Sequence, residues 1–157
     1  MSAHTEQSVT FREATTEDLP ALAELRWEME VERHSQQFSL EVYAAAFDRS
    51  MREEMERGHF RAWLAEADGQ AVACVVLIWW PTPPHFENLN RKRAFVSSVY
   101  TRPDYRRRGI GRTLMTMLMD ASRGMGIQRL ILWASDMGRP LYEELGFTDS
   151  RGMEFNV

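Results

Sequence analysis

The feature that most constrains this chain is a strand, a glycine-containing turn and a helix in direct succession over residues 99–119. An apolar segment ends at Thr101, a turn follows, and Gly109 and Gly111 flank Ile110 where a helix begins. From Ile110 onward apolar residues recur at steps of three and four, which is the period of an α-helix. A glycine turn ahead of a helix exposes backbone N–H groups, and the helix dipole adds partial positive charge there. The stretch therefore predicts an anion-binding corner suited to a diphosphate.

Four arginines surround this turn, and their planar charged groups match the geometry of phosphate oxygens. They are Arg106, Arg107, Arg108 and Arg112. The net charge is −4, yet residues 91–112 carry eight bases and one acid. A nucleic-acid-binding domain is normally basic overall, with aromatic residues among the charges. One basic corner in an acidic chain instead favours a small phosphorylated ligand and no nucleic acid. Nucleic-acid binding through these arginines is kept as a further hypothesis, beside the two given at the end of this subsection.

Length and composition indicate one ordinary domain spanning residues 1–157. The only cysteine, Cys74, lies in an apolar run and is expected to be buried; it excludes an internal disulfide and a multi-cysteine zinc site. The histidines lack metal-ligand spacing, so no metal is expected. The N-terminus does not resemble a secretory signal, and the longest apolar run, about ten residues, is too short to cross a bilayer. We therefore expect a cytoplasmic protein that does not associate with membranes.

The pattern of apolar residues predicts an alternating series of strands and helices. In chain order we expect a strand at 9–14, a helix at 19–33, a second helix from 40 to Gly58, strands at 60–67, 70–80 and 93–101, a helix at 110–124, a strand at 129–134, a short helix at 135–146, and one or two closing strands within 147–157. The dipeptide Asp68-Gly69 is a strong signal for a tight hairpin between two of these strands. The segment between residues 81 and 92 is either a rim of an acceptor site or a plain surface connection.

The order of these elements predicts a mixed sheet. The strands at 93–101 and 129–134 are joined through a helix, so they should be parallel neighbours, whereas the hairpin makes its two strands antiparallel. The tryptophans are expected mostly in the core, although Trp27 and Trp80 could line an acceptor pocket. The expected fold class is therefore α/β, with helices on both faces of the sheet.

Two motifs resemble those of the GNAT superfamily of N-acetyltransferases. The segment 106–111, Arg-Arg-Arg-Gly-Ile-Gly, fits the family's central pattern of Gln or Arg, two residues, Gly, one residue, and Gly or Ala. A second motif, Leu-Tyr-x-x-Leu-Gly-Phe, is present at 141–147. The resemblance covers 99–147 well, and residues before Ala94 agree in the order of their elements. It implies a mostly antiparallel central sheet whose fourth and fifth strands are parallel and splayed around a slot.

The resemblance also implies acetyl-CoA, or another acyl-CoA, as the donor in direct transfer to an amine. The main chain at 99–101 would pair with the pantetheine arm, the amides from 107 to 112 would hold the diphosphate, and Tyr142 would be the general acid that protonates the departing thiolate. A packing role for Tyr142 is the alternative. The residues assigned to the cofactor are Val99, Tyr100, Thr101, Arg106, Arg107, Arg108, Gly109, Ile110, Gly111, Arg112 and Ser135.

Three departures from the family pattern limit what can be carried over. Ser135 stands where Asn is frequent, and Gly138 replaces a common Ala, a change expected to be harmless. The strand at 95–101 lacks the carboxylate that serves some members as general base. The base is then either a chain of waters or a carboxylate from elsewhere, for which the candidates are Glu28, Glu30 and Glu87.

The leading hypothesis is an acetyltransferase acting on the amine of a small molecule, with a protein N-terminus or lysine as the other acceptor. A non-catalytic domain that binds or senses acyl-CoA is the alternative, since the strand carboxylate is missing. Dimers are common among soluble proteins and in this family, so a homodimer is left open.

Overall fold

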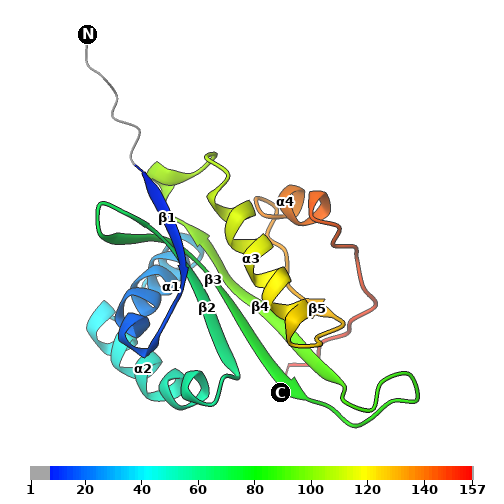
Figure 1. The fold of residues 1–157 in the computed structure, drawn as a ribbon. Helices are drawn as coiled ribbons and strands as arrows, with labels where there is room; N and C mark the ends of the chain where they lie inside the picture. The colour runs from blue at the N-terminus through cyan, green and yellow to red at the C-terminus, as the bar shows by residue number, and fades with distance from the viewer. Residues whose placement is uncertain (1–7, 157) are drawn as a thin grey trace.

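Five strands form one sheet in the order β1-β2-β3-β4-β5, in a computed structural model that describes residues 8–156 (Figure 1). The strands are β1 (Val9–Glu13), β2 (Phe60–Ala67), β3 (Gln70–Pro81), β4 (Lys92–Thr101) and β5 (Leu130–Ile131). The helices are α1 (Leu19–Arg33), α2 (Leu40–Glu56), α3 (Ile110–Gly124) and α4 (Arg139–Glu144). Neighbouring strands are antiparallel from β1 to β4, and β4 and β5 are parallel. The mixed, mostly antiparallel α/β fold is confirmed.

The β2–β3 hairpin has the turn that its sequence predicts. Asp68 and Gly69 both have positive φ, 51° and 75°, which is the geometry of the hairpin turn that matches strand twist. The register then places Leu64 opposite Cys74, and both are buried. Burial raises the pKa of the Cys74 thiol to about 12, so this cysteine is an inert core residue.

Helices cover both faces of the sheet, as Figure 1 shows, with α3 on one face and α1 and α2 on the other. On α3 the residues at four-residue spacing, Ile110, Leu114 and Leu118, are buried against β2, β3 and β4. On α1, Leu25 and Met29 are buried against the opposite face. The C-terminal end of β4 leads through residues 102–109 to the start of α3.

The C-terminal part of the chain is less regular than the sequence predicts. The strand expected at 129–134 is reduced to Leu130 and Ile131, which are half-buried because β5 is an edge strand. The helix expected at 135–146 begins only at Arg139.

The prediction of closing strands is wrong for the residues that the structure describes, since 147–156 contain none. Met153 and Phe155 lie exposed there. The preceding residues are polar and include Gly152, so the segment has too little apolar surface to offset the entropy cost of ordering it as a strand.

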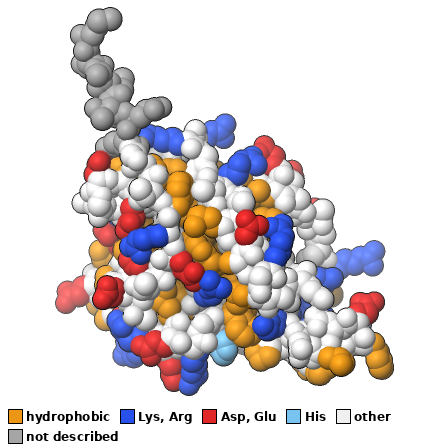
Figure 2. Space-filling model, viewed as in Figure 1, with side chains coloured by type: hydrophobic (Ala, Val, Ile, Leu, Met, Phe, Trp, Pro, Cys, Tyr) orange, Lys and Arg blue, Asp and Glu red, His pale blue; other side chains and the backbone are white. Residues whose placement is uncertain are grey.

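No helix within residues 8–156 is long and apolar enough to span a membrane. On the face seen in Figure 2, acidic and basic side chains are interspersed around apolar ones.

Candidate functional site: the α3 turn and the gap between β4 and β5

The turn before α3 presents its backbone to solvent. Gly109 has φ of 76° and precedes the first helical residue, and Arg107 has φ of 64°, a conformation that side chains disfavour. Within the described chain, the N–H groups of residues 107–112 donate to no main-chain carbonyl, whereas Thr113 N–H donates to Gly109 O at 3.1 Å. Residues 107–109 are exposed. The turn therefore has the free donors and the helix dipole that an anion requires.

The four arginines near this turn differ in what they bind. Arg107 makes no hydrogen bond or ion pair with any described residue, so its guanidinium is free for a ligand. Arg108 Nη2 donates to Asp104 O at 2.8 Å, and Arg112 pairs with Glu144. Arg106 Nε donates to Thr101 O at 2.8 Å. The sequence predicted that all four guanidinium groups surround the turn and can contact phosphate, but within the described residues the structure leaves only that of Arg107 unpartnered.

Arg106 belongs to a network that sequence reasoning did not find. Its Nη2 donates to Glu32 Oε2 at 2.7 Å, and the Tyr100 hydroxyl donates to Glu32 Oε1 at 2.5 Å. Burial alone would raise the pKa of Glu32, but these two hydrogen bonds lower it below its ordinary value. Burial and the same bond to Glu32 raise the pKa of Tyr100. The network ties the end of β4 to α1, and no local pattern in the sequence signals a contact between residues so far apart.

A bulge interrupts β4 near the point where it separates from β5. The register with β3 passes from Val76–Ser97 to Cys74–Tyr100, which inserts one extra residue on β4, and Ser98 there has φ of 49°. Arg26 Nη1 donates to the hydroxyls of Ser97 and Ser98, at 2.9 and 2.8 Å. Both serine side chains therefore lie toward α1.

The β4–β5 pairing ends before this bulge. It joins only Ala94 to Leu130 and Phe95 to Ile131, so within the described residues the β5 side of β4 is unpaired from 96 to 101. The parallel, splayed arrangement is thus present.

Trp133, expected in the core, is instead 71% exposed and packs on Phe95 with ring centroids 4.5 Å apart.

Tyr142 lies on α4 beside this gap, buried in the same apolar cluster as α3. Its hydroxyl has no hydrogen-bond partner within residues 8–156. Burial raises the pKa of Tyr142 above its ordinary value of 10.0, and the positive charge of Arg33 opposes that shift weakly. The phenol therefore keeps its proton at neutral pH and has it free to donate.

Gly138 makes room for the Tyr142 ring. A Cβ on residue 138 would lie 2.9 Å from Tyr142 Cε2 and 3.1 Å from its hydroxyl oxygen, distances that require a displacement. Ser135 stabilises the same turn, because its hydroxyl oxygen accepts from Gly138 N–H at 3.2 Å. In this chain an Ala at 138 could not be accommodated without a shift of the Tyr142 ring or of the turn.

The carboxylates considered as general bases are already engaged. Glu28 accepts from Arg102 through both oxygens, at 3.0 and 2.8 Å. Glu30 pairs with Arg26 at 3.0 Å. Glu87 lies on the 82–91 loop beside the start of β4, away from Tyr142.

Fold and motifs together define a class of acyl-transferring protein, and the chain matches the model of the Acetyltransferase (GNAT) family over residues 19–147. The protein belongs to that family. A search of solved structures shows the same fold in a predicted acetyltransferase from Clostridium acetobutylicum with acetyl-CoA. The TM-score is 0.85, the identity is 22%, and 95% of this chain and 96% of that one are covered.

Two curated relatives carry more specific names. Glucosamine 6-phosphate N-acetyltransferase of Trypanosoma brucei brucei is 36% identical over 64 residues, which cover 41% of this chain and 44% of that protein. Amino-acid acetyltransferase of Pasteurella multocida is 27% identical over 158 residues, covering 96% of this chain and 31% of that protein. The matches therefore span less than half the length of either relative.

Proposed function

We propose that this protein is an acetyl-CoA-dependent N-acetyltransferase whose acceptor is the amine of a small molecule. The α3 turn carries the proposal: the N–H groups of 107–112 lack main-chain acceptors among the described residues, and the Arg107 guanidinium is free beside them. Donors arranged in this way fit the diphosphate of CoA, and the glycines at 109 and 111 let it approach the backbone.

The same proposal assigns the other cofactor contacts to the unpaired side of β4. The main chain of Val99, Tyr100 and Thr101 would hold the pantetheine arm, and Ser135 lies at the turn that leads to Tyr142. Acetyl-CoA supplies an acetyl group activated as a thioester. The residues present fit this ligand, since the β4 edge is a free row of peptide groups that an extended amide-containing chain can pair with.

Tyr142 acts as the general acid in this proposal. Its hydroxyl is buried, protonated at neutral pH and free of any acceptor among the described residues, so its proton can pass to the departing sulfur. The acceptor ammonium loses its proton to water, because Glu28 and Glu30 are held in ion pairs. The names of the two curated relatives, which give glucosamine 6-phosphate and an amino acid, support a small-molecule acceptor.

The test is acetyl-CoA turnover over a panel of amines, including amino sugars, amino acids, polyamines and peptide N-termini. We expect at least one small amine to be acetylated, and Tyr142→Phe to lower kcat by about 100-fold, as loss of a general acid does. Tyr43→Phe, a phenol on α2 away from the gap, is the matched control and should leave kcat unchanged. Tight CoA binding with no acetylation of any amine would favour an acyl-CoA sensor instead.

A further inference from the structure

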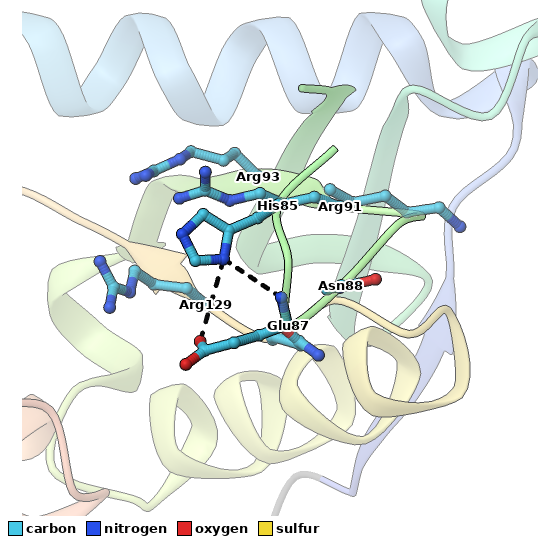
Figure 3. Close-up of a pocket in the computed structure, with 8 residues that line it drawn as sticks. His85, Glu87, Asn88, Arg91, Arg93 and Arg129 are labelled. Atoms are coloured by element: carbon cyan, nitrogen blue, oxygen red, sulfur yellow. Dashed lines mark hydrogen bonds and ion pairs between the residues drawn. The ribbon is translucent and has the colours of Figure 1, made fainter. Parts of the chain in front are cut away.

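A second group of arginines lies at the opposite end of β4 from the α3 turn. A pocket of about 390 Å³ opens there between the 82–91 loop, the start of β4 and the residues just before β5. Figure 3 shows Arg91, Arg93 and Arg129 extending toward the same side of this pocket, around the imidazole of His85. Two segments that lie far apart in the sequence, residues 91–93 and Arg129, therefore bring cations to one cavity.

These three arginines are not neutralised by the protein. None of their guanidinium groups makes a hydrogen bond or an ion pair within residues 8–156. Lys92 in the same pocket is occupied, since its Nζ donates to Met125 O at 2.9 Å and lies over the Trp79 ring. Glu87 is the acid among the lining residues, and its carboxylate is 4.0 Å from His85 Nδ1. Most other arginines of the chain are paired, so this pocket has an unusual excess of positive charge.

We propose that this pocket is a second anion-binding site, whose ligand is a small phosphate monoester or a diphosphate. Guanidinium groups form paired, charge-assisted hydrogen bonds with phosphate oxygens. Like charges that share a cavity repel one another, so a bound dianion also removes a destabilising interaction. The pocket is large enough for a small metabolite, and it is a local cavity rather than an extended groove that would hold a polymer.

This pocket is separate from the gap between β4 and β5 where acetyl transfer is proposed, so the anion site goes beyond the proposed function. Ser97, next to the bulge, is four positions along the strand from Arg93, a distance of about 13 Å. Arg93 and Arg129 directly precede Ala94 and Leu130, a pair in the short β4–β5 ladder. An anion held by both arginines therefore fastens β5 to β4 at the closed end of the gap.

The test is calorimetric titration with pyrophosphate and with inorganic phosphate. The protein is first saturated with CoA, so that the α3 turn is already occupied. The titration is then repeated on CoA-saturated Arg107→Gln, which should bind pyrophosphate as the wild type does. We expect saturable binding and a rise in Tm. Arg93→Gln and Arg129→Gln should each weaken the affinity at least tenfold. Arg49→Gln, an exposed arginine on α2 without a partner among the described residues, is the matched control and should bind as the wild type does.

A conservative variant, Arg129→Lys, distinguishes the loss of a contact with the anion from a general loss of folding. This variant keeps the positive charge but loses the paired N–H donors of the guanidinium, so it should bind with an affinity between those of the wild type and Arg129→Gln. The circular dichroism spectrum of every variant should match that of the wild type. The proposal is overturned if the wild type shows no saturable binding of pyrophosphate or phosphate. It is equally overturned if Arg93→Gln and Arg129→Gln bind these anions as tightly as the wild type does. It is also overturned if only heparin or oligonucleotides bind.

Discussion

Gly138 shows how the absence of one methyl group leaves room for the ring of Tyr142. The ring of Tyr142 occupies the space that a Cβ at 138 would need, and the N–H of Gly138 is held by Ser135. The Tyr142 hydroxyl makes no hydrogen bond with any described residue. In the proposed reaction this hydroxyl would act through its position rather than its acidity, because burial raises the pKa of the phenol.

Gly138→Ala should therefore impair the reaction while leaving the hydroxyl in place. The added Cβ displaces the ring, and a misplacement of about 1 Å can cost up to about 100-fold in rate. We expect kcat to fall by about 10-fold or more with CoA affinity unchanged, measured by steady-state kinetics and calorimetry. Gly124→Ala, where a Cβ meets nothing within 4 Å, is the control and should match the wild type. An unchanged kcat in Gly138→Ala would contradict this role.

Glu32 should make stability depend on pH. Its folded-state pKa is lowered, so the stabilisation is present above its ordinary pKa of 4.5 and is lost as the pH falls through the folded value. Glu32→Gln should then have a lower Tm than the wild type at pH 7, with the difference narrowing below about pH 4.5. Thermal unfolding at several pH values measures this. Glu53→Gln, in an exposed pair with Arg57, should show little difference at any pH, and a constant gap for Glu32→Gln would rule the linkage out.

At the scale of elements, the bulge in β4 depends on a side chain from α1. Arg26 donates to both serine hydroxyls, and Ser98 is buried with an uncommon positive φ. The bulge lies just beyond the residues of β4 that pair with β5. Strain of this kind persists only where the surrounding contacts hold it.

Arg26→Met should lower the free energy of unfolding by about 1–3 kcal/mol, because it leaves a buried hydroxyl without its donor. The matched control is Arg52→Met, which removes an exposed pair with Asp48 and should change the free energy of unfolding much less than Arg26→Met does. Urea unfolding compares the two variants. Equal losses would show that Arg26 does not support the bulge.

The sequence predicts best those turns and helices that are specified by residues adjacent to one another in the chain. The turn at Gly109, the helix that follows it and the Asp68-Gly69 hairpin are each specified by adjacent residues, and all three are confirmed. The length of β5 depends on how far β4 stays beside it, which an apolar run cannot reveal. The contact of Glu32 with Tyr100 joins residues 68 positions apart, and it depends on the packing of α1 on the sheet.

At the scale of the whole molecule, the sheet is complete without the last residues of the chain. The five strands are paired in order, and residues 151–156 are exposed with no regular structure. A chain ending after Ser150 should therefore keep its Tm within about 2 °C of the full-length protein, since surface changes seldom exceed about 0.5 kcal/mol. A large loss of Tm would show that this segment pairs with the sheet after all.

The two ends of β4 give the molecule two cationic regions with different neighbours. The α3 turn combines free backbone donors with Arg107, and the opposite pocket relies on side chains alone. The first is expected to bind a diphosphate within a large cofactor, the second a small free anion. The net charge of −4 means that neither depends on a generally basic surface.

The most direct measurement for the central claim is the amide NMR spectrum of the 15N-labelled protein during titration with CoA and, separately, with pantetheine. If the α3 turn holds the diphosphate, CoA should shift the amide resonances of residues 107–112 most strongly, and pantetheine should leave them unchanged and bind at least 10-fold more weakly. CoA binding that leaves those amides unshifted, or equal affinity for pantetheine, would contradict the account.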